Sequence, residues 1–133
     1  MAFFQRPPVL QRRQHLPRQV PIDAYGGAPG FRFADMAHPG SILALPSGIY
    51  GWAADNAAAI DAASLALILD EAAAIDVLII GTGADVVMLR PDLRAVLKGH
   101  GIGAEAMATS SAVRTYNILL AEGRPVAAAL IAP

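Results

Sequence analysis

Residues 76–83 read Asp-Val-Leu-Ile-Ile-Gly-Thr-Gly, an uninterrupted apolar run that ends in a glycine-containing turn. Consecutive apolar residues without polar alternation are typical of a strand that is buried on both faces of a sheet. Such strands occur mainly in parallel sheets whose faces are covered by helices. This stretch therefore predicts an α/β domain.

Two helix–strand units are predicted downstream of this strand. They comprise a helix from Asp92 framed by Pro91, Gly99 and Gly101, a strand at 105–108, a helix from a Thr109 cap to about Glu122, and a strand at 126–131. Crossover connections of this kind join parallel strands. The C-terminal half is thus predicted to be β-α-β-α-β.

The N-terminal half has a different pattern, with short strands separated by turn residues. Strands are predicted at 22–25, 31–33, 41–45 and 49–52, and a helix at 61–73. The turn Pro46-Ser47-Gly48 joins the last two strands into an antiparallel hairpin. Because this hairpin is antiparallel and the C-terminal strands are parallel, the whole pattern predicts a single α/β domain over residues 20–133 with a mixed sheet.

Length, charge and cysteine content limit the classes of function. The chain has 133 residues, which is the size of one domain, and a net charge of −1, which does not favour nucleic-acid binding. It has no cysteine, which excludes disulfides, thiol catalysis and Cys-ligated metals. No uncharged apolar stretch is long enough to span a membrane. We expect a cytoplasmic protein.

The charge is unevenly distributed along the sequence. Residues 1–19 hold four arginines and no acidic residue, whereas residues 20–133 hold six basic and eleven acidic side chains. Three prolines in the first stretch oppose a continuous helix. We interpret residues 1–19 as a flexible basic arm that could contact an acidic partner or, peripherally, the inner membrane. The same prolines argue against an organelle presequence.

Gly81, Thr82 and Gly83 form the first candidate site. A dinucleotide-binding fingerprint requires a third glycine at position 86, which is valine here, and a helix that starts earlier than Pro91. Two interpretations stay open. The glycines either allow a sharp turn and close packing, or they form a pocket for a small anion or a peptide carboxylate.

The predicted last helix adds residues to this candidate ligand or partner surface. Thr109 begins the helix, and Ser110, Arg114 and Asn117 share one of its faces. Helix N-termini attract anions, and this one should emerge beside the glycine turn. The alternative is an ordinary solvated face in which Arg114 pairs with Asp85 or Glu122.

Catalytic and metal-binding patterns are weak. His15, His38 and His100 have no metal-type spacing and are expected in turns or on the surface. No nucleophile elbow or phosphate-binding loop occurs, and no paired carboxylates are suitably placed. We predict no cofactor and no metal, and the enzyme hypothesis stays open but disfavoured.

The chain resembles a small α/β domain family. The residues that carry the resemblance are 40–46 with Trp52, 76–83, Pro91, Leu97, Gly101, Ile102, Thr109, Ala112, 114–117, Leu119, Glu122, 126–131 and Pro133. The family includes the mitochondrial NADH:ubiquinone oxidoreductase complex assembly factor 3 and bacterial and archaeal proteins of unassigned function. The resemblance covers roughly residues 20–133. It implies a single three-layer domain with a mixed central sheet of about five strands flanked by helices, and no established catalytic activity.

Two hypotheses of function follow. The first is a non-enzymatic binding or assembly factor that recognises a partner protein, at a membrane complex, in a bacterial rather than a mitochondrial setting. The second is a small-molecule or anion-binding domain with a pocket between the glycine turn and the Thr109 helix start. A homodimer is compatible with the alanine-rich, weakly charged sequence.

Overall fold

The strand predicted at residues 77–80 is β6 (Val77–Gly81), and it lies inside a six-stranded sheet in the computed structural model, which describes residues 14–23 and 30–133. The other strands are β1 (Gln14–Leu16), β2 (Phe31–Phe33), β3 (Met36–His38), β4 (Ile42–Leu45), β5 (Gly48–Gly51), β7 (Gly103–Met107) and β8 (Val126–Leu130). The helical elements are η1 (Ala57–Ala59), α2 (Ala66–Asp70), η2 (Ala72–Ala74), α3 (Pro91–Gly99) and α4 (Thr109–Ala121).

The sheet is mixed, as predicted, and its strand order is β1-β5-β4-β8-β6-β7. β6 pairs in parallel with β7 and β8, while β4 pairs antiparallel with β5 and β8. The strand that comes last in the sequence, β8, therefore lies between the two halves of the sheet. β1 pairs with β5 and adds a sixth strand, while β2 and β3 form a separate antiparallel hairpin.

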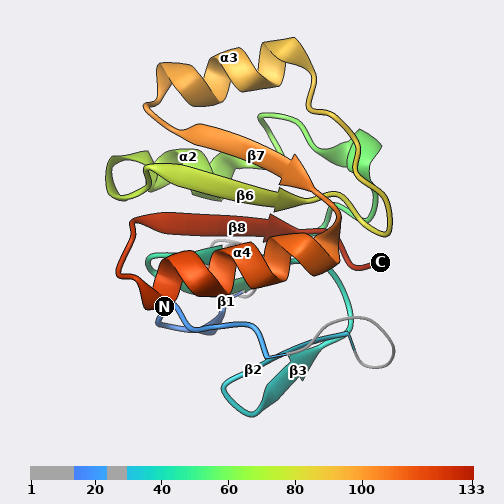
Figure 1. Ribbon diagram of the computed structural model, residues 1–133, viewed down its shortest axis with the longest axis vertical. Coiled ribbons are helices and arrows are strands. Elements are labelled where there is room, and N and C mark those ends of the chain that lie inside the picture. The colour runs from blue at the N-terminus through green and yellow to red at the C-terminus, as the bar shows by residue number, and fades with distance from the viewer. Residues whose placement is uncertain (1–13, 24–29) are drawn as a thin grey trace, which may run out of the picture.

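The sheet separates two apolar cores, which gives the three layers that were predicted (Figure 1). α4 and the β2–β3 hairpin cover one face. The core on that side includes Phe31, Phe33, Val113 and Tyr116. α2 covers the other face and α3 lies beside β7 at the edge of the sheet, around a core that includes Trp52, Leu65, Ile68, Leu93 and Leu97.

The helix predicted at 61–73 is shorter than expected. Only Ala66–Asp70 is α-helical, because the preceding turn is closed by side chains: Ser64 N–H donates to Asp61 Oδ1 over 2.8 Å. The Ser64 carbonyl accepts the Trp52 indole N–H over 2.7 Å and is thereby occupied by a side chain that follows β5. A tertiary contact on its N-terminal side therefore delays the start of this helix.

Two predicted strands also differ from the structure. Ile22 and Asp23 belong to no strand, and residues 24–25 lie outside the described residues. The strand predicted at 105–108 begins earlier and occupies Gly103–Met107. The remaining predicted elements are present, with ends that differ by a few residues at most.

The segment from Gln14 to Ile22 lies along the domain. Gln14–Leu16 form β1, Gln19 Nε2 donates to the Val126 carbonyl over 2.7 Å, and the Tyr116 hydroxyl donates to the Val20 carbonyl over 2.7 Å. Of the arm predicted at residues 1–19, positions 14–19 thus contact the fold, and positions 1–13 lie outside the described residues. No helix in the described part of the chain is long and apolar enough to cross a bilayer.

Candidate functional site

The loop after β6 and the start of α4 lie against each other at the carboxyl end of the parallel strands. The Gly83 N–H donates to Thr109 Oγ1 over 2.9 Å, and the Thr109 N–H donates to the Gly83 carbonyl over 2.9 Å. The Thr109 hydroxyl also donates to the Ile131 carbonyl over 2.8 Å. Thr109 is therefore the first residue of α4 and not its cap, because its hydroxyl joins three segments instead of closing its own helix.

Gly81 shows why this junction requires glycine. A Cβ atom at position 81 would lie 2.9 Å from Thr109 Oγ1 and 3.0 Å from Thr109 Cα. Contacts that short require the helix to shift away from β6. Gly83 has a φ of +105°, which other residues rarely adopt. Close packing and a sharp turn thus account for both glycines.

Thr82 fixes the conformation of the loop that follows. Its hydroxyl donates to the Asp85 carbonyl over 2.7 Å and accepts the Val87 N–H over 3.0 Å. The side chain is buried, with 6% of its surface exposed. The polar groups of Thr82 therefore shape the backbone of residues 82–87.

Ser110, Arg114 and Asn117 have different environments although they share one face of α4. Asn117 is occupied, because its Oδ1 accepts the Ile22 N–H over 2.9 Å and its Nδ2 donates to the Ile22 carbonyl over 2.8 Å. Ser110 is half-buried, and Arg114 is exposed without an ion pair to any described residue. Glu122, one of its suggested partners, instead approaches Arg124 at 3.9 Å.

A groove that the sequence did not predict lies beside the 82–90 loop. Its volume is about 540 Å³, and its lining is formed by Asn56, Ala57, Ala58, Ile60, Thr82, Val87, Met88, Leu89, Arg90 and Leu93. Leu89 is buried, but three other apolar side chains of the loop are exposed: Val86 by 56%, Val87 by 47% and Met88 by 71%. The groove is thus flanked by apolar surface that the domain itself leaves in contact with solvent.

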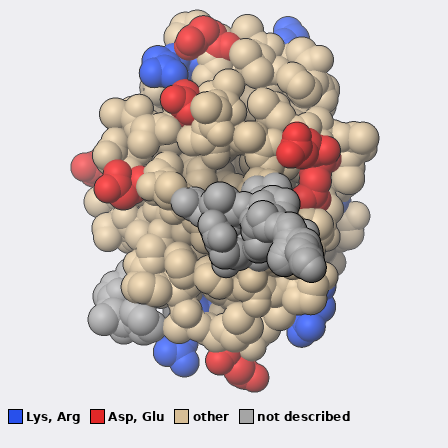
Figure 2. All heavy atoms as spheres, turned by 180° about the vertical axis from the view of Figure 1, so that it is seen from behind, with Lys and Arg blue, Asp and Glu red and all other residues tan. Residues whose placement is uncertain are grey.

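A shallower hollow of about 330 Å³ adjoins this groove and shares Asn56, Ala57, Thr82 and Val87 with it. It brings Asp55 and Asp85 to the rim, while Arg90 on the groove side pairs with Asp92 at 3.5 Å. Seen from the face opposite α4, most of the charged side chains lie toward the periphery of the molecule (Figure 2). The sequence signal for the groove was the run Val86-Val87-Met88, which stands outside every predicted helix and strand.

His15 and His38 are neighbours. The sequence analysis expected each of them in a turn or on the surface and did not predict this contact. Their ring centroids are 4.5 Å apart, and His15 Nε2 is buried without a hydrogen-bond partner among residues 14–23 and 30–133. Burial lowers the pKa of His15. Burial, together with the nearby His15, lowers the pKa of His38. Within the same residues, no group of three or more His, Cys, Asp or Glu side chains is placed to hold a metal ion.

Comparison with known proteins gives relatives over nearly the full length of the chain. An uncharacterized protein of Rhodobacter capsulatus is 41% identical over 114 residues, spanning 84% of each chain. The NADH dehydrogenase [ubiquinone] 1 alpha subcomplex assembly factor 3 of Mus musculus is 29% identical over 131 residues, spanning 98% of this chain and 70% of the mouse protein. The chain is therefore distantly related to complex I assembly factors.

The fold also matches solved structures. The crystal structure of an outer membrane protein from Bartonella henselae superposes with a TM-score of 0.84 at 47% identity, covering 89% of this chain and 98% of the other. The model of the family described as "Protein of unknown function (DUF498/DUF598)" matches residues 22–131, which span every strand except β1 and all the helices. This chain is a member of the DUF498/DUF598 family.

Proposed function

We propose that this protein binds a partner polypeptide during the assembly of a membrane-associated complex and catalyses no reaction of its own. The distant relationship with complex I assembly factor 3 supports this class of function. The observation that carries the proposal is the exposed apolar run Val86-Val87-Met88 beside the 540 Å³ groove.

The physical argument concerns the cost of leaving this surface uncovered. Each Å² of apolar surface that is removed from water stabilises a complex by about 25 cal/mol. A cluster of exposed apolar side chains therefore favours association. The loop is held by the Thr82 hydrogen bonds, so little conformational entropy is lost when a partner binds. Methionine at the tip adapts to partners of different shape. An apolar segment of a partner chain, such as one face of an amphipathic helix, fits this groove.

The test is affinity capture from the protein's own cells, with quantitative mass spectrometry. The variant carries Val86→Ser and Met88→Ser together. We expect recovery of respiratory-complex or other membrane-assembly subunits to fall roughly tenfold, because the apolar contacts that hold the partner are lost. Both side chains are largely exposed, so the thermal unfolding midpoint should change little.

Ile118→Ser is the matched control. Ile118 is 59% exposed on α4, away from the groove, so its replacement removes an exposed apolar side chain elsewhere on the surface. We expect the control to capture partners as the unchanged protein does. Equal loss in both variants, or no loss in the loop variant, would contradict the role of the groove.

Anion binding at Gly81, Thr82, Gly83, Thr109, Ser110 and Arg114 is the second candidate function. The observation that favours it is the exposed Arg114 guanidinium, which has no ion pair with a described residue. The engaged hydroxyl of Thr109 leaves Arg114 and Ser110 as the groups that would contact an anion. Thermal shifts with phosphate and with short carboxylates, lost in Arg114→Ala, would support it. Identical shifts in the two proteins would exclude Arg114 from any such site.

The basic segment at residues 1–19 is proposed to add a peripheral contact with an anionic membrane surface, from the cytoplasmic side. Each basic residue near such a surface contributes about 1 kcal/mol. The test variant replaces Arg6, Arg12 and Arg13 together by glutamine. It keeps β1 intact, whereas a deletion of residues 1–19 would remove this strand. Co-sedimentation with anionic vesicles at low salt should fall in this variant. Unchanged recovery would remove the segment from the proposal.

A further inference from the structure

β7 forms one edge of the six-stranded sheet, and its outer side is unpaired among the described strands. All five of its residues align with β6. The Gly103 N–H and the Met107 carbonyl bond toward β6. Because backbone groups alternate in direction along a strand, those of Ala104 and Ala106 point outward. The edge thus presents a short ladder that another strand can complete.

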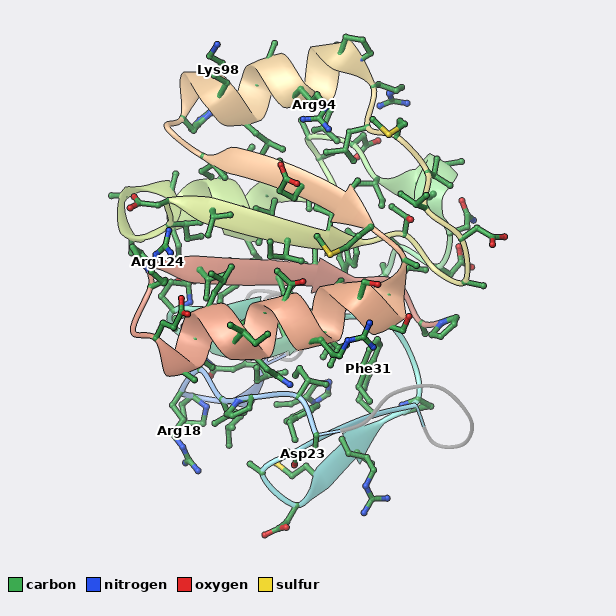
Figure 3. The ribbon with its side chains drawn as sticks, in the orientation of Figure 1. Arg18, Asp23, Phe31, Arg94, Lys98 and Arg124 are labelled. Carbon is green, nitrogen blue, oxygen red and sulfur yellow. The ribbon has the colours of Figure 1, made fainter. Side chains whose placement is uncertain are left out.

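α3 overhangs this edge and turns it into a groove. A hollow of about 530 Å³ is lined by Arg94, Lys98, Gly101, Ile102, Gly103 and Ala104. Arg94 Nη1 donates to the outward carbonyl of Ala104 over 3.3 Å. Figure 3 shows Arg94 reaching from α3 toward β7. Lys98, one turn further along the same helix, also lines the hollow, but its ammonium group points away from β7. A strand added here would be covered by α3 on one face, as the inner strands are covered by their own helices.

The side chains of β7 leave room for a neighbouring strand. Gly103, Ala104 and Ala106 are small, and β7 contains no proline or lysine of the kind that protects exposed edges. The only charged side chain in β7 is Glu105, which is exposed. Glu105 shares its face with Met107, which packs in the core under α4, whereas Ala104 and Ala106 pack toward α3. The carboxylate therefore lies on the face opposite Arg94 and Lys98.

The charges determine which segment fits. Arg94 and Lys98 are exposed and form no ion pair with any described residue, and the groove lining contains no acidic side chain. We propose that the outer edge of β7 binds an extended acidic segment of a partner polypeptide as an additional strand, with carboxylates on the α3 side. Main-chain hydrogen bonds supply the attachment, and the two cations select the side chains.

A second copy of this chain is a poorer occupant. Two-fold antiparallel pairing of β7 with itself would place Glu105 near its own copy on one face. On the other face, Arg94 and Lys98 would meet their copies. Like charges that are directly opposed across a sheet or interface are destabilising. The charge pattern therefore favours a different chain.

The test uses the full chain labelled with ¹⁵N and a short blocked peptide in which glutamate alternates with valine or threonine. We expect amide shifts confined to β7, α3 and the loop between them. A peptide with lysine in place of glutamate should bind at least roughly tenfold more weakly. The Arg94→Gln variant should bind the acidic peptide more weakly, to a similar degree. The control is Arg124→Gln. Arg124 is an exposed arginine just before β8, which β6 separates from β7, so this variant should leave binding unchanged.

Ala106→Pro provides a second variant, because it removes an outward N–H at an edge position where proline is tolerated. It should abolish peptide binding. Equal binding of both peptides, shifts outside β7 and α3, or no binding at millimolar peptide would overturn the proposal. A dimer in sedimentation that Ala106→Pro dissolves would assign the edge to a second copy instead. The proposal is independent of the apolar groove, since the Val86 and Met88 substitutions do not touch this edge.

Discussion

α4 and α3 follow parallel strands in the same way, yet they use their polar residues differently. α4 crosses the middle of the sheet, and its Thr109, Tyr116 and Asn117 all bond to segments distant in the sequence. α3 lies at the edge, buries Leu93 and Leu97, and leaves Arg94 and Lys98 exposed. The central helix thus uses these three polar side chains to hold the fold together, whereas the helix at the edge leaves both of its long cationic side chains exposed.

Tyr116→Ala should have the largest effect on stability and tests the structural role of α4. Tyr116 is fully buried, and its truncation leaves a large cavity, so we expect a loss of about 4 kcal/mol in the free energy of unfolding. Urea denaturation measures it. Tyr116→Phe keeps the ring but removes the hydroxyl with its hydrogen bond to the Val20 carbonyl, and should cost about 1 kcal/mol. If the two losses were equal, the hydroxyl and not the packing would dominate.

Gly81→Ala should cause the next largest loss in the free energy of unfolding, about 2–3 kcal/mol. The reason is that the new Cβ would collide with the backbone of Thr109. Gly99→Ala in α3 is the matched control, since a Cβ there meets nothing within 4 Å. Alanine is the better helix former, so that variant should be stabilised by about 0.5 kcal/mol. Thermal and urea unfolding of both proteins check the comparison. A neutral Gly81→Ala would show that α4 can move away from β6.

Asn117→Ala should cost about 1–2 kcal/mol, because the backbone N–H and carbonyl of Ile22 both lose their partners. Arg114→Ala, one turn earlier on the same helix, should change stability by less than about 0.5 kcal/mol. Hydrogen exchange should show faster exchange at the Ile22 amide in the first variant alone. Similar losses in both variants would mean that Arg114 also has a structural role.

The smallest effect concerns pH and the two histidines. The pKa values of His15 and His38 are lowered in the fold, so the unfolded chain takes up protons at a higher pH than the folded one. Stability should be constant above about pH 7.5. It should then decrease as the pH falls through 6.5, the ordinary histidine pKa, toward the lowered pKa of the folded state. Thermal melts across this pH range measure the effect. Stability should depend less steeply on pH in His15→Gln and in His38→Gln than in the unchanged protein.

Most of the fold could be predicted because its signals are local. The apolar run of β6, the alternation of β2, and Pro91 with Gly99 around α3 each identify an element within a few residues. The short length of α2 could not be predicted, because it depends on a distant side chain: the indole N–H of Trp52 donates to the Ser64 carbonyl. β1 was also missed, since its residues become a strand only through pairing with β5.

The candidate site was harder to predict. The meeting of the glycine turn with Thr109 followed from parallel topology and is present in the structure. The use of Asn117 could not be predicted, because its partner Ile22 lies 95 residues away in the sequence. The apolar groove depends on which loop residues the core leaves uncovered. Val86, Val87 and Met88 look like core residues in the sequence, and only the three-dimensional structure shows them exposed.

The position of β8 has a consequence for how the chain is made. During synthesis, β4 and β5 emerge early, β6 and β7 later, and β8 follows last of the described strands. Until β8 inserts between β4 and β6, the nascent chain has two half-sheets, each with an open inner edge of apolar residues. Cooperative folding therefore has to wait until β8 has left the ribosome. Until then, the two open edges are sites at which the growing chain can pair with other chains.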